Sequence, residues 1–244
     1  MLSYVSAYKE VAQILTKNVR ITGSIRDFVY TSVKDDIINL VLKPGTEISE
    51  KEVADKLEVS RTPVREAFLK LAQEELLSIY PQIGTVISKI DLDHVEEARF
   101  IRENIEKAIV RLASLEFGKE QLFRLEKNIA MQELCLKKGT HQQLFELDEE
   151  FHEIFYDECQ KQRTWKMIRQ MKSHFDRVRV LRLATNKDWD FLISQHKEIY
   201  EAIVDRNPDQ AEKALVRHLK LVNFEKADLI EEYPDYFFMA TPAK

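Results

Sequence analysis

The sequence predicts a mainly α-helical protein, with a small N-terminal domain that carries a short sheet and a larger C-terminal antiparallel bundle of helices. The chain has 244 residues, 44% of them hydrophobic, which suffices for one sizeable core and a smaller one. Charged residues make up 32%, and there are only 5 glycines and 6 prolines, a balance that favours long helices over a turn-rich sandwich or barrel. The pattern changes near Ile90, where short elements give way to six long helical patterns.

Composition and charge limit the classes of function. No apolar run reaches the ~20 residues of a membrane span, and the start lacks a basic segment followed by an apolar one, so we expect a soluble, cytoplasmic protein. Cys135 and Cys159 lack paired-motif spacing, and we expect buried, reduced thiols. The net charge of -5 argues against a nucleic-acid partner unless positive charge is concentrated on one face.

Turn signals and the change of pattern divide the chain into four segments. Residues 1–22 are predicted to form an N-terminal extension and residues 23–90 the first domain. The helical domain is predicted for residues 91–235, followed by a C-terminal tail at 236–244.

The first domain is predicted to begin with a helix from Arg26 to Leu40. Lys43-Pro44-Gly45 ends this helix, because proline cannot continue it and glycine supports the turn. A second helix is predicted to start at Ser49, whose spacing to Glu52 is that of a capping box.

Residues 49–74 have the pattern of a helix-turn-helix. Ser60 is expected to cap the second helix, and Pro63 falls in its first turn, where the missing N–H costs little. The inward positions are Val53, Ala54, Leu57, Val59, Val64, Ala67, Phe68 and Leu71. Two strands around a tight turn, residues 76–80 and 85–88, are predicted to follow as a wing, which makes the domain a winged helix-turn-helix.

Three polar residues lie at the N-terminal end of the second helix, on its outward face. Arg61, Thr62 and Arg65 stand where a recognition helix presents side chains to the major groove and its own amides to phosphate. The positive charge that DNA binding needs is therefore local. The competing interpretation is an ordinary helical hairpin with surface arginines.

In the predicted bundle, four polar side chains fall on or beside apolar helix faces. Asp148 and His152 lie one turn apart on one helix, and His196 and His218 lie on two others. A single inward histidine is most often a hydrogen-bonded core residue, but burying four unpaired polar groups is costly, and one metal ion would satisfy all of them. The donor set suits Zn²⁺, Ni²⁺, Mn²⁺ or Fe²⁺. His94, His141 and His174 are expected to be solvated.

A second inward set is charged. Arg102 and Glu106 lie one turn apart on the helix predicted from Leu92 to Leu115, and Arg182 is similarly placed on a later helix. A buried arginine needs an anion, which is either Glu106 in an internal ion pair or a small carboxylate held jointly with the metal.

The stretch from Val59 to Ala67, with Lys43-Pro44-Gly45 before it and Ile83-Gly84-Thr85-Val86 after it, resembles the winged helix-turn-helix of GntR-family transcriptional regulators. The resemblance implies that Arg61 and Arg65 read bases, that Thr62 contacts phosphate and that Gly84 lets the wing approach the minor groove. Lys51 stands where an arginine often reaches the DNA backbone, so the charge is kept but the bidentate fork is lost.

The bundle resembles the FCD effector domain of the FadR-type branch of that family, in particular its metal-binding members. The resemblance is carried by Arg102-x-x-x-Glu106, Asp148-x-x-x-His152, Gln195-His196 and Arg217-His218. It implies Asp148, His152, His196 and His218 as metal ligands and Arg102 as the contact to an effector carboxylate. Lys161 departs from the small Gly-Asn turn that members often have, which could alter access to the pocket.

These features together predict a homodimeric, metabolite-responsive regulator, more often a repressor in this family, that binds a palindromic operator on double-stranded DNA. Two other hypotheses stay open at this point. The bundle could be a metal-dependent enzyme acting on a small carboxylate with Glu106 as general base, or a helical oligomer whose histidines are merely core residues.

Overall fold

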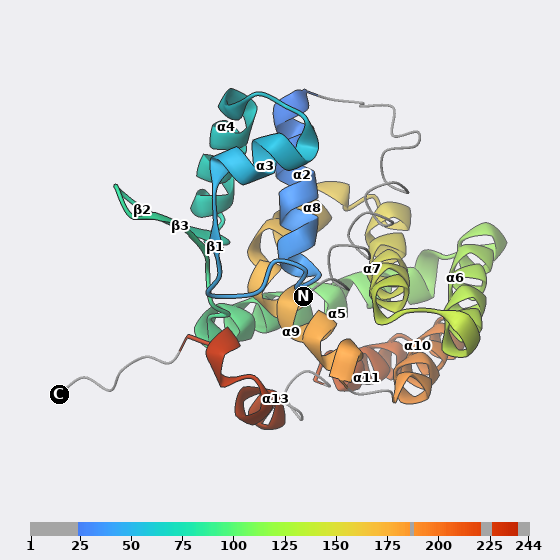
Figure 1. Cartoon of the computed structure of the whole chain (residues 1–244). Coiled ribbons are helices and arrows are strands. Elements are labelled where there is room, and N and C mark those ends of the chain that lie inside the picture. Colours follow the sequence, from blue (N-terminus) through green and yellow to red (C-terminus); the bar gives the residue numbers. More distant parts are fainter. Residues whose placement is uncertain (1–23, 186–187, 221–225, 239–244) are drawn as a thin grey trace.

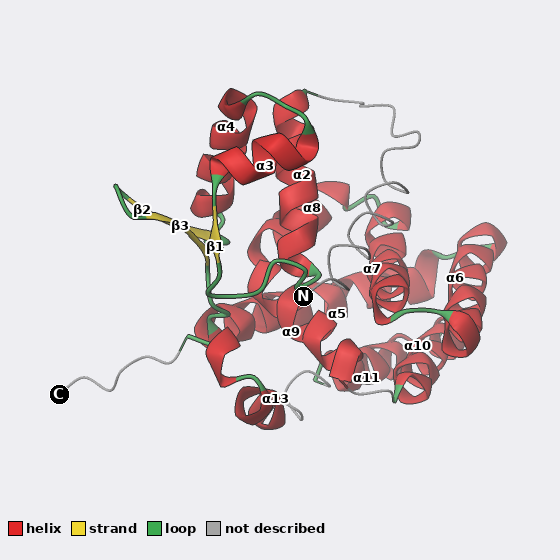
Figure 2. Cartoon of the chain, in the orientation of Figure 1, coloured by secondary structure: helices red, strands yellow, loops and turns green. Residues whose placement is uncertain are grey.

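The computed structural model describes residues 24–185, 188–220 and 226–238, so the predicted extension at residues 1–22 lies outside the described residues. The N-terminal domain contains α2 (Ile25–Ile38), α3 (Glu50–Leu57) and α4 (Arg61–Gln73). Its sheet is formed by β1 (Glu47–Ile48), β2 (Leu77–Tyr80) and β3 (Gly84–Ile87), antiparallel in the order β1-β3-β2. The β2–β3 hairpin is the predicted wing and projects away from the body (Figure 2). The short strand β1 was not predicted.

Local signals set the ends of these helices. Leu40 follows α2 with a left-handed φ of 57°, and Gly45 has a φ of 78° in the turn before β1. The capping box of Ser49 and Glu52 is present, as predicted. Ser60 is the N-cap residue of α4, but its side chain makes no capping hydrogen bond, so that part of the prediction is wrong.

The second domain is helical, as predicted. Its elements are α5 (Leu92–Glu116), α6 (Lys119–Lys138), α7 (His141–Glu158), α8 (Gln162–Met171), α9 (Ser173–Thr185), α10 (Trp189–Val204), α11 (Pro208–Leu219), α13 (Lys226–Glu232) and a 3-10 turn η1 (Pro234–Tyr236). Residues 162–185, one of the six helical patterns of the sequence, form two helices, because the chain leaves helical geometry at Lys172 between α8 and α9.

Helix α9 lies in the middle of the molecule (Figure 1). Every side chain from Ser173 to Leu183 is buried, and the helix packs against α5 and α7 of the bundle and against α2 of the N-terminal domain. A large apolar cluster fills both domains, and a smaller one surrounds Ile90, where the domains join. Helix α9 thus touches both the bundle core and the N-terminal domain.

Two further expectations can be compared with the structure. Cys135 and Cys159 are buried and free, as predicted. Within the described ranges, none of the helices combines the length and the apolar character that crossing a bilayer requires.

Candidate metal centre and DNA-binding face

The structure brings Asp148, His152, His196 and His218 together in the bundle. They come from α7, α10 and α11, all four are buried, and one donor atom from each lies within 4.8 Å of the others. His152 Nε2 is 3.1 Å from His218 Nε2, and His196 Nε2 is 3.2 Å from Asp148 Oδ1. Three imidazole nitrogens and one carboxylate oxygen therefore converge on one small volume, which is the donor set of a transition-metal site.

The outward nitrogens of two of these histidines face acceptors. His152 Nδ1 lies 2.8 Å from Glu106 Oε2, and His196 Nδ1 bonds Gln132 Oε1 at 2.7 Å. Gln132 Nε2 in turn donates to Asn128 Oδ1 at 2.7 Å. A proton on Nδ1 leaves the Nε2 lone pair aimed at the centre, which is how a carboxylate or amide orients a metal-binding histidine.

The electrostatics of the cluster fit a cation. Burial, followed by neighbouring positive groups and imidazoles, holds the pKa of His196 and of His218 well below the ordinary value, so both rings are neutral, the form that binds metal. His196 Nε2 is buried and has no hydrogen-bond partner among the described residues, although it faces Asp148. A metal ion at the convergence point would satisfy this nitrogen, and the residues present fit such an ion.

Arginine side chains lie beside the four donors. Arg102 Nε donates to Glu106 Oε1 at 2.8 Å, both groups being buried, so the internal ion pair considered from the sequence is present. Burial alone raises the pKa of Glu106, but Arg102 and His152 outweigh it and hold that pKa at about 2. Glu106 is therefore an ionised carboxylate held by two partners.

Arg179 is a functional candidate that the sequence analysis missed. Its guanidinium contacts Asp148 Oδ2, and its Nη1 donates to Asp176 Oδ1 at 2.9 Å and to Glu149 Oε1. It lies three residues before Arg182 and so on the same face of α9, a spacing that could have pointed to it.

A cavity of about 30 Å³ adjoins the cluster. It is lined by Arg102, Arg179, Arg182, Asp148 and His218 and by the apolar side chains of Phe175, Leu183, Leu192 and Leu219. Such a volume holds about two water-sized groups. It suits a very small anion, because guanidinium groups and apolar side chains both line it.

The predicted DNA-binding residues are all exposed on the N-terminal domain. Arg61, Thr62 and Arg65 are exposed in the first turns of α4, and Lys51 is exposed on α3. Gly84 opens β3 with a φ of 152°, a backbone conformation that favours glycine, and a Cβ built there would meet no described atom within 4 Å. Beside it Ile83, at the wing tip, is 82% exposed.

The remaining histidines do not all behave as predicted. His94 is partly exposed and lies 3.0 Å from Glu75 Oε2, and His141 is half-buried. His174 is buried at 4% exposure, so its prediction as a solvated residue is wrong. Its Nδ1 accepts a hydrogen bond from the Asp91 N–H at 2.9 Å, because α9 lies inside the molecule rather than at its surface.

We expect His174 to make the free energy of unfolding depend on pH. Burial, and then Arg177, lowers its pKa to about 4, below the ordinary 6.5. As the pH falls, the unfolded chain takes up a proton at this histidine before the folded chain does. The contribution of His174 to the free energy of unfolding is therefore full above about pH 6.5, and it falls by up to about 3 kcal/mol as the pH approaches 4. Urea unfolding of wild type and His174→Gln between these pH values measures it. In His141→Gln the free energy of unfolding should depend on pH as it does in wild type. If His174→Gln also shows the wild-type dependence on pH, His174 is not its source.

Both domains match known protein families. Residues 25–87 match the family described as bacterial regulatory proteins, gntR family, and residues 97–221 match the FCD domain. The chain is 34% identical over 216 residues to the HTH-type transcriptional repressor RspR of Escherichia coli. The matched region covers 88% of this chain and 95% of that protein. An HTH-type transcriptional regulator of Streptomyces ambofaciens is 31% identical over 215 residues, or 88% and 90% of the two chains.

The solved structure of E. coli McbR/YncC superposes on 87% of this chain and 100% of that one with a TM-score of 0.74. A putative GntR regulator from Rhodococcus gives a TM-score of 0.68 over 86% and 100%. At 22% and 21% identity these likenesses show the fold alone. The family matches and the curated relatives together show that the chain belongs to the GntR family of bacterial transcriptional regulators, with a C-terminal FCD domain, and is a DNA-binding regulator rather than an enzyme.

Proposed function

We propose that this regulator is a homodimeric repressor that binds a palindromic operator and releases it when a small carboxylate binds at a metal ion in the FCD domain. The observation that carries the proposal is the buried convergence of Asp148, His152, His196 and His218 beside a cavity walled by arginines. The similar protein RspR is a transcriptional repressor, which supports repression as the sign of regulation.

Asp148 and the three histidines would hold the ion, with Glu106 and Gln132 fixing two of the rings. Zn²⁺, Ni²⁺, Mn²⁺ and Fe²⁺ all suit this donor set. A bound ion supplies a Lewis-acidic anchor for a carboxylate oxygen. The chain's own contribution is to exclude water and to keep three imidazoles facing inward.

The effector would lie against Arg102, Arg179 and Arg182, with its apolar part against Phe175 and Leu192. A planar guanidinium matches a carboxylate in a bidentate manner, which favours a carboxylate over a neutral ligand of equal size. The cavity volume restricts the effector to a few heavy atoms unless side chains move.

The DNA-binding half of the proposal rests on α4. Its exposed N-terminal turn presents Arg61 and Arg65 for base edges in the major groove and Thr62 for phosphate. Lys51 adds a phosphate contact from α3, and Gly84 lets the wing backbone approach the minor groove. A two-fold dimer would place two such helices on the half-sites of a palindrome.

A thermal-shift screen of Zn²⁺-loaded protein against small carboxylates, followed by operator gel shifts with each hit, tests the proposal. We expect a hit to raise Tm, since saturation at about 100 times Kd adds about 2.7 kcal/mol, and to weaken operator binding about 5- to 150-fold. The control is His196→Ala, which should not respond. A carboxylate that stabilises His196→Ala as much as wild type, or one that binds without affecting the operator, would contradict the proposal.

A further inference from the structure

One face of α9 belongs to the effector cavity. Phe175, Arg179, Arg182 and Leu183 line the cavity wall, and Arg179 also contacts Asp148, one of the four converging donors. If Asp148, Arg179 or Arg182 moves when the metal and effector site is occupied, α9 is therefore displaced with it.

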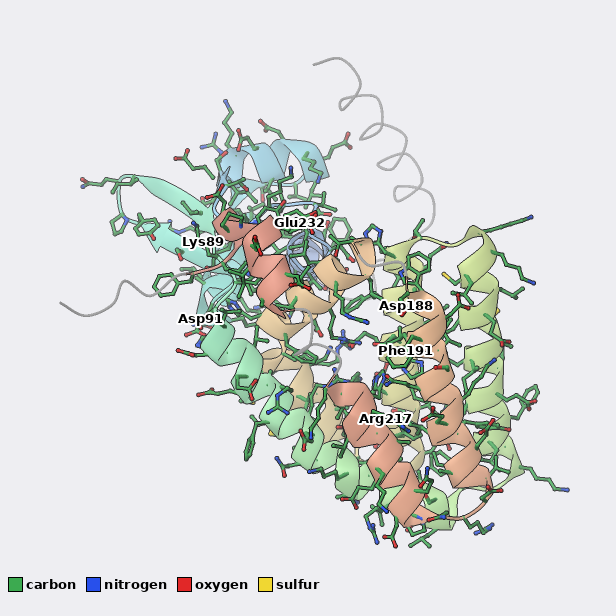
Figure 3. All side chains as sticks on the ribbon, turned by 90° about the horizontal axis from the view of Figure 1, so that it is seen from below. Lys89, Asp91, Asp188, Phe191, Arg217 and Glu232 are labelled. Carbon is green, nitrogen blue, oxygen red and sulfur yellow. The ribbon has the colours of Figure 1, made fainter. Side chains whose placement is uncertain are left out.

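Other side chains of the same helix hold the linker between the two domains, residues 88–91, which joins β3 of the wing to the start of α5. Arg177 Nη2 donates to the Ser88 carbonyl at 2.5 Å, and His174 Nδ1 accepts from the Asp91 N–H at 2.9 Å. Both ends of the linker are thus bonded to one helix. Lys89 and Asp91 lie beside the N-terminal domain, away from Phe191 and Arg217 of the bundle (Figure 3).

The middle of the linker is also fixed. Ile90 is fully buried in the smaller apolar cluster with Phe175, Val178 and Leu181 of α9. Its N–H donates to the Tyr236 carbonyl at 2.8 Å, and its carbonyl accepts from the Phe238 N–H at 2.8 Å. Phe175 contributes to this cluster and to the cavity wall, so a single side chain touches both.

Arg177 is held at a cost in stability. Its side chain is fully buried, its Nε and Nη1 have no hydrogen-bond partner, and no ion pair involving it occurs in the described part of the chain. Burial lowers its pKa to about 9. A buried guanidinium without an anion destabilises the fold. Stabilisation of the core therefore does not explain why an arginine stands at position 177, and its hydrogen bond to the linker points to another role.

We propose that Arg177 and His174 are the positioning residues through which the metal and effector site sets the position of the DNA-binding domain, with α9 as the moving element. This inference rests on the proposed function. A helix moves as a rigid rod, so a shift or rotation imposed at Arg179 and Arg182 reaches Ser88 and Asp91 through the two linker bonds. Helix α2 packs on α9 as well and would follow the same movement.

Hydrogen–deuterium exchange of the full-length protein, with Zn²⁺ alone as the probe, tests the coupling. In wild type we expect Zn²⁺ to slow exchange locally, in residues 144–155, and to change exchange at a distance, in residues 88–95 and 25–38. Arg177→Met should keep the local effect and lose the distant one. Arg163→Met, an exposed arginine of α8, should behave as wild type.

Operator affinity gives a second readout. We expect Zn²⁺ to change the operator affinity of wild type about fivefold or more. The change should shrink to less than about twofold in Arg177→Met. It should be largely restored in Arg177→Lys, which keeps a donor for Ser88. Should Arg177→Met not fold, His174→Gln takes its place with the same expected loss.

The outcomes separate this inference from the proposed function. If the distant change persists in Arg177→Met, or if wild type shows the local change without a distant one, the coupling role is wrong while the metal site stands. If wild type shows no local change, the proposed metal site itself fails, and this inference fails with it.

Discussion

Replacing His196 by alanine is expected to abolish stoichiometric metal binding. The ring supplies one of three converging imidazole nitrogens in a set of four donors. Loss of a group that merely orients a ligand costs about 10- to 100-fold in metal affinity, so loss of a ligand should cost more than about 100-fold. Elemental analysis and calorimetric titration with Zn²⁺ measure this directly.

Two variants calibrate that result. Gln132→Leu removes the acceptor at His196 Nδ1 and should weaken Zn²⁺ binding by about 10- to 100-fold without abolishing it. His141→Ala changes a half-buried histidine at the start of α7 and should leave the affinity unchanged. Equal Zn²⁺ affinity in wild type and His196→Ala would refute the assignment of the donor set.

Arg65→Ala is expected to weaken binding to the operator about 5- to 150-fold, which corresponds to about 1–3 kcal/mol, and to weaken non-specific DNA binding much less. Arg65 is exposed on the first turns of α4, while the packing residues of that helix, Val64 and Phe68, lie on its other face. The substitution should therefore leave the fold intact.

Fluorescence anisotropy with operator and scrambled duplexes at one fixed salt concentration measures the two affinities. Arg163→Ala removes an equally exposed arginine from α8 and is the matched control for charge. If Arg65→Ala weakens both duplexes by the same factor, Arg65 contacts phosphate and does not read bases.

Much of the fold could be predicted because its signals are local. The capping box at Ser49 and Glu52 acts within a few residues and occurs in the structure as expected. Gly45 does stand in a turn, but α2 already ends at Ile38, so Lys43-Pro44-Gly45 is not what ends that helix. Asp148 and His152 share a helix face by their spacing alone. His196 and His218 could be added because each sits in the apolar stripe of an amphipathic helix.

The residues that were missed lie on α9, and the reason is physical. This helix is buried on every side, and charged residues such as Asp176, Arg177 and Arg179 occur around it, so the apolar face that placed Arg182 inward gives no sign that the other faces are buried too. His174 was for this reason expected at the surface, and Arg179 was not singled out. Their places depend on contacts with α5, α7 and the linker, far away in sequence.

X-ray absorption at the zinc edge of the Zn²⁺-loaded protein shows directly whether these four side chains bind the ion. We expect a bound ion with three imidazole nitrogens and carboxylate oxygen at about 2.0–2.2 Å. A shell containing sulfur, or a spectrum with fewer than two imidazoles, would contradict it.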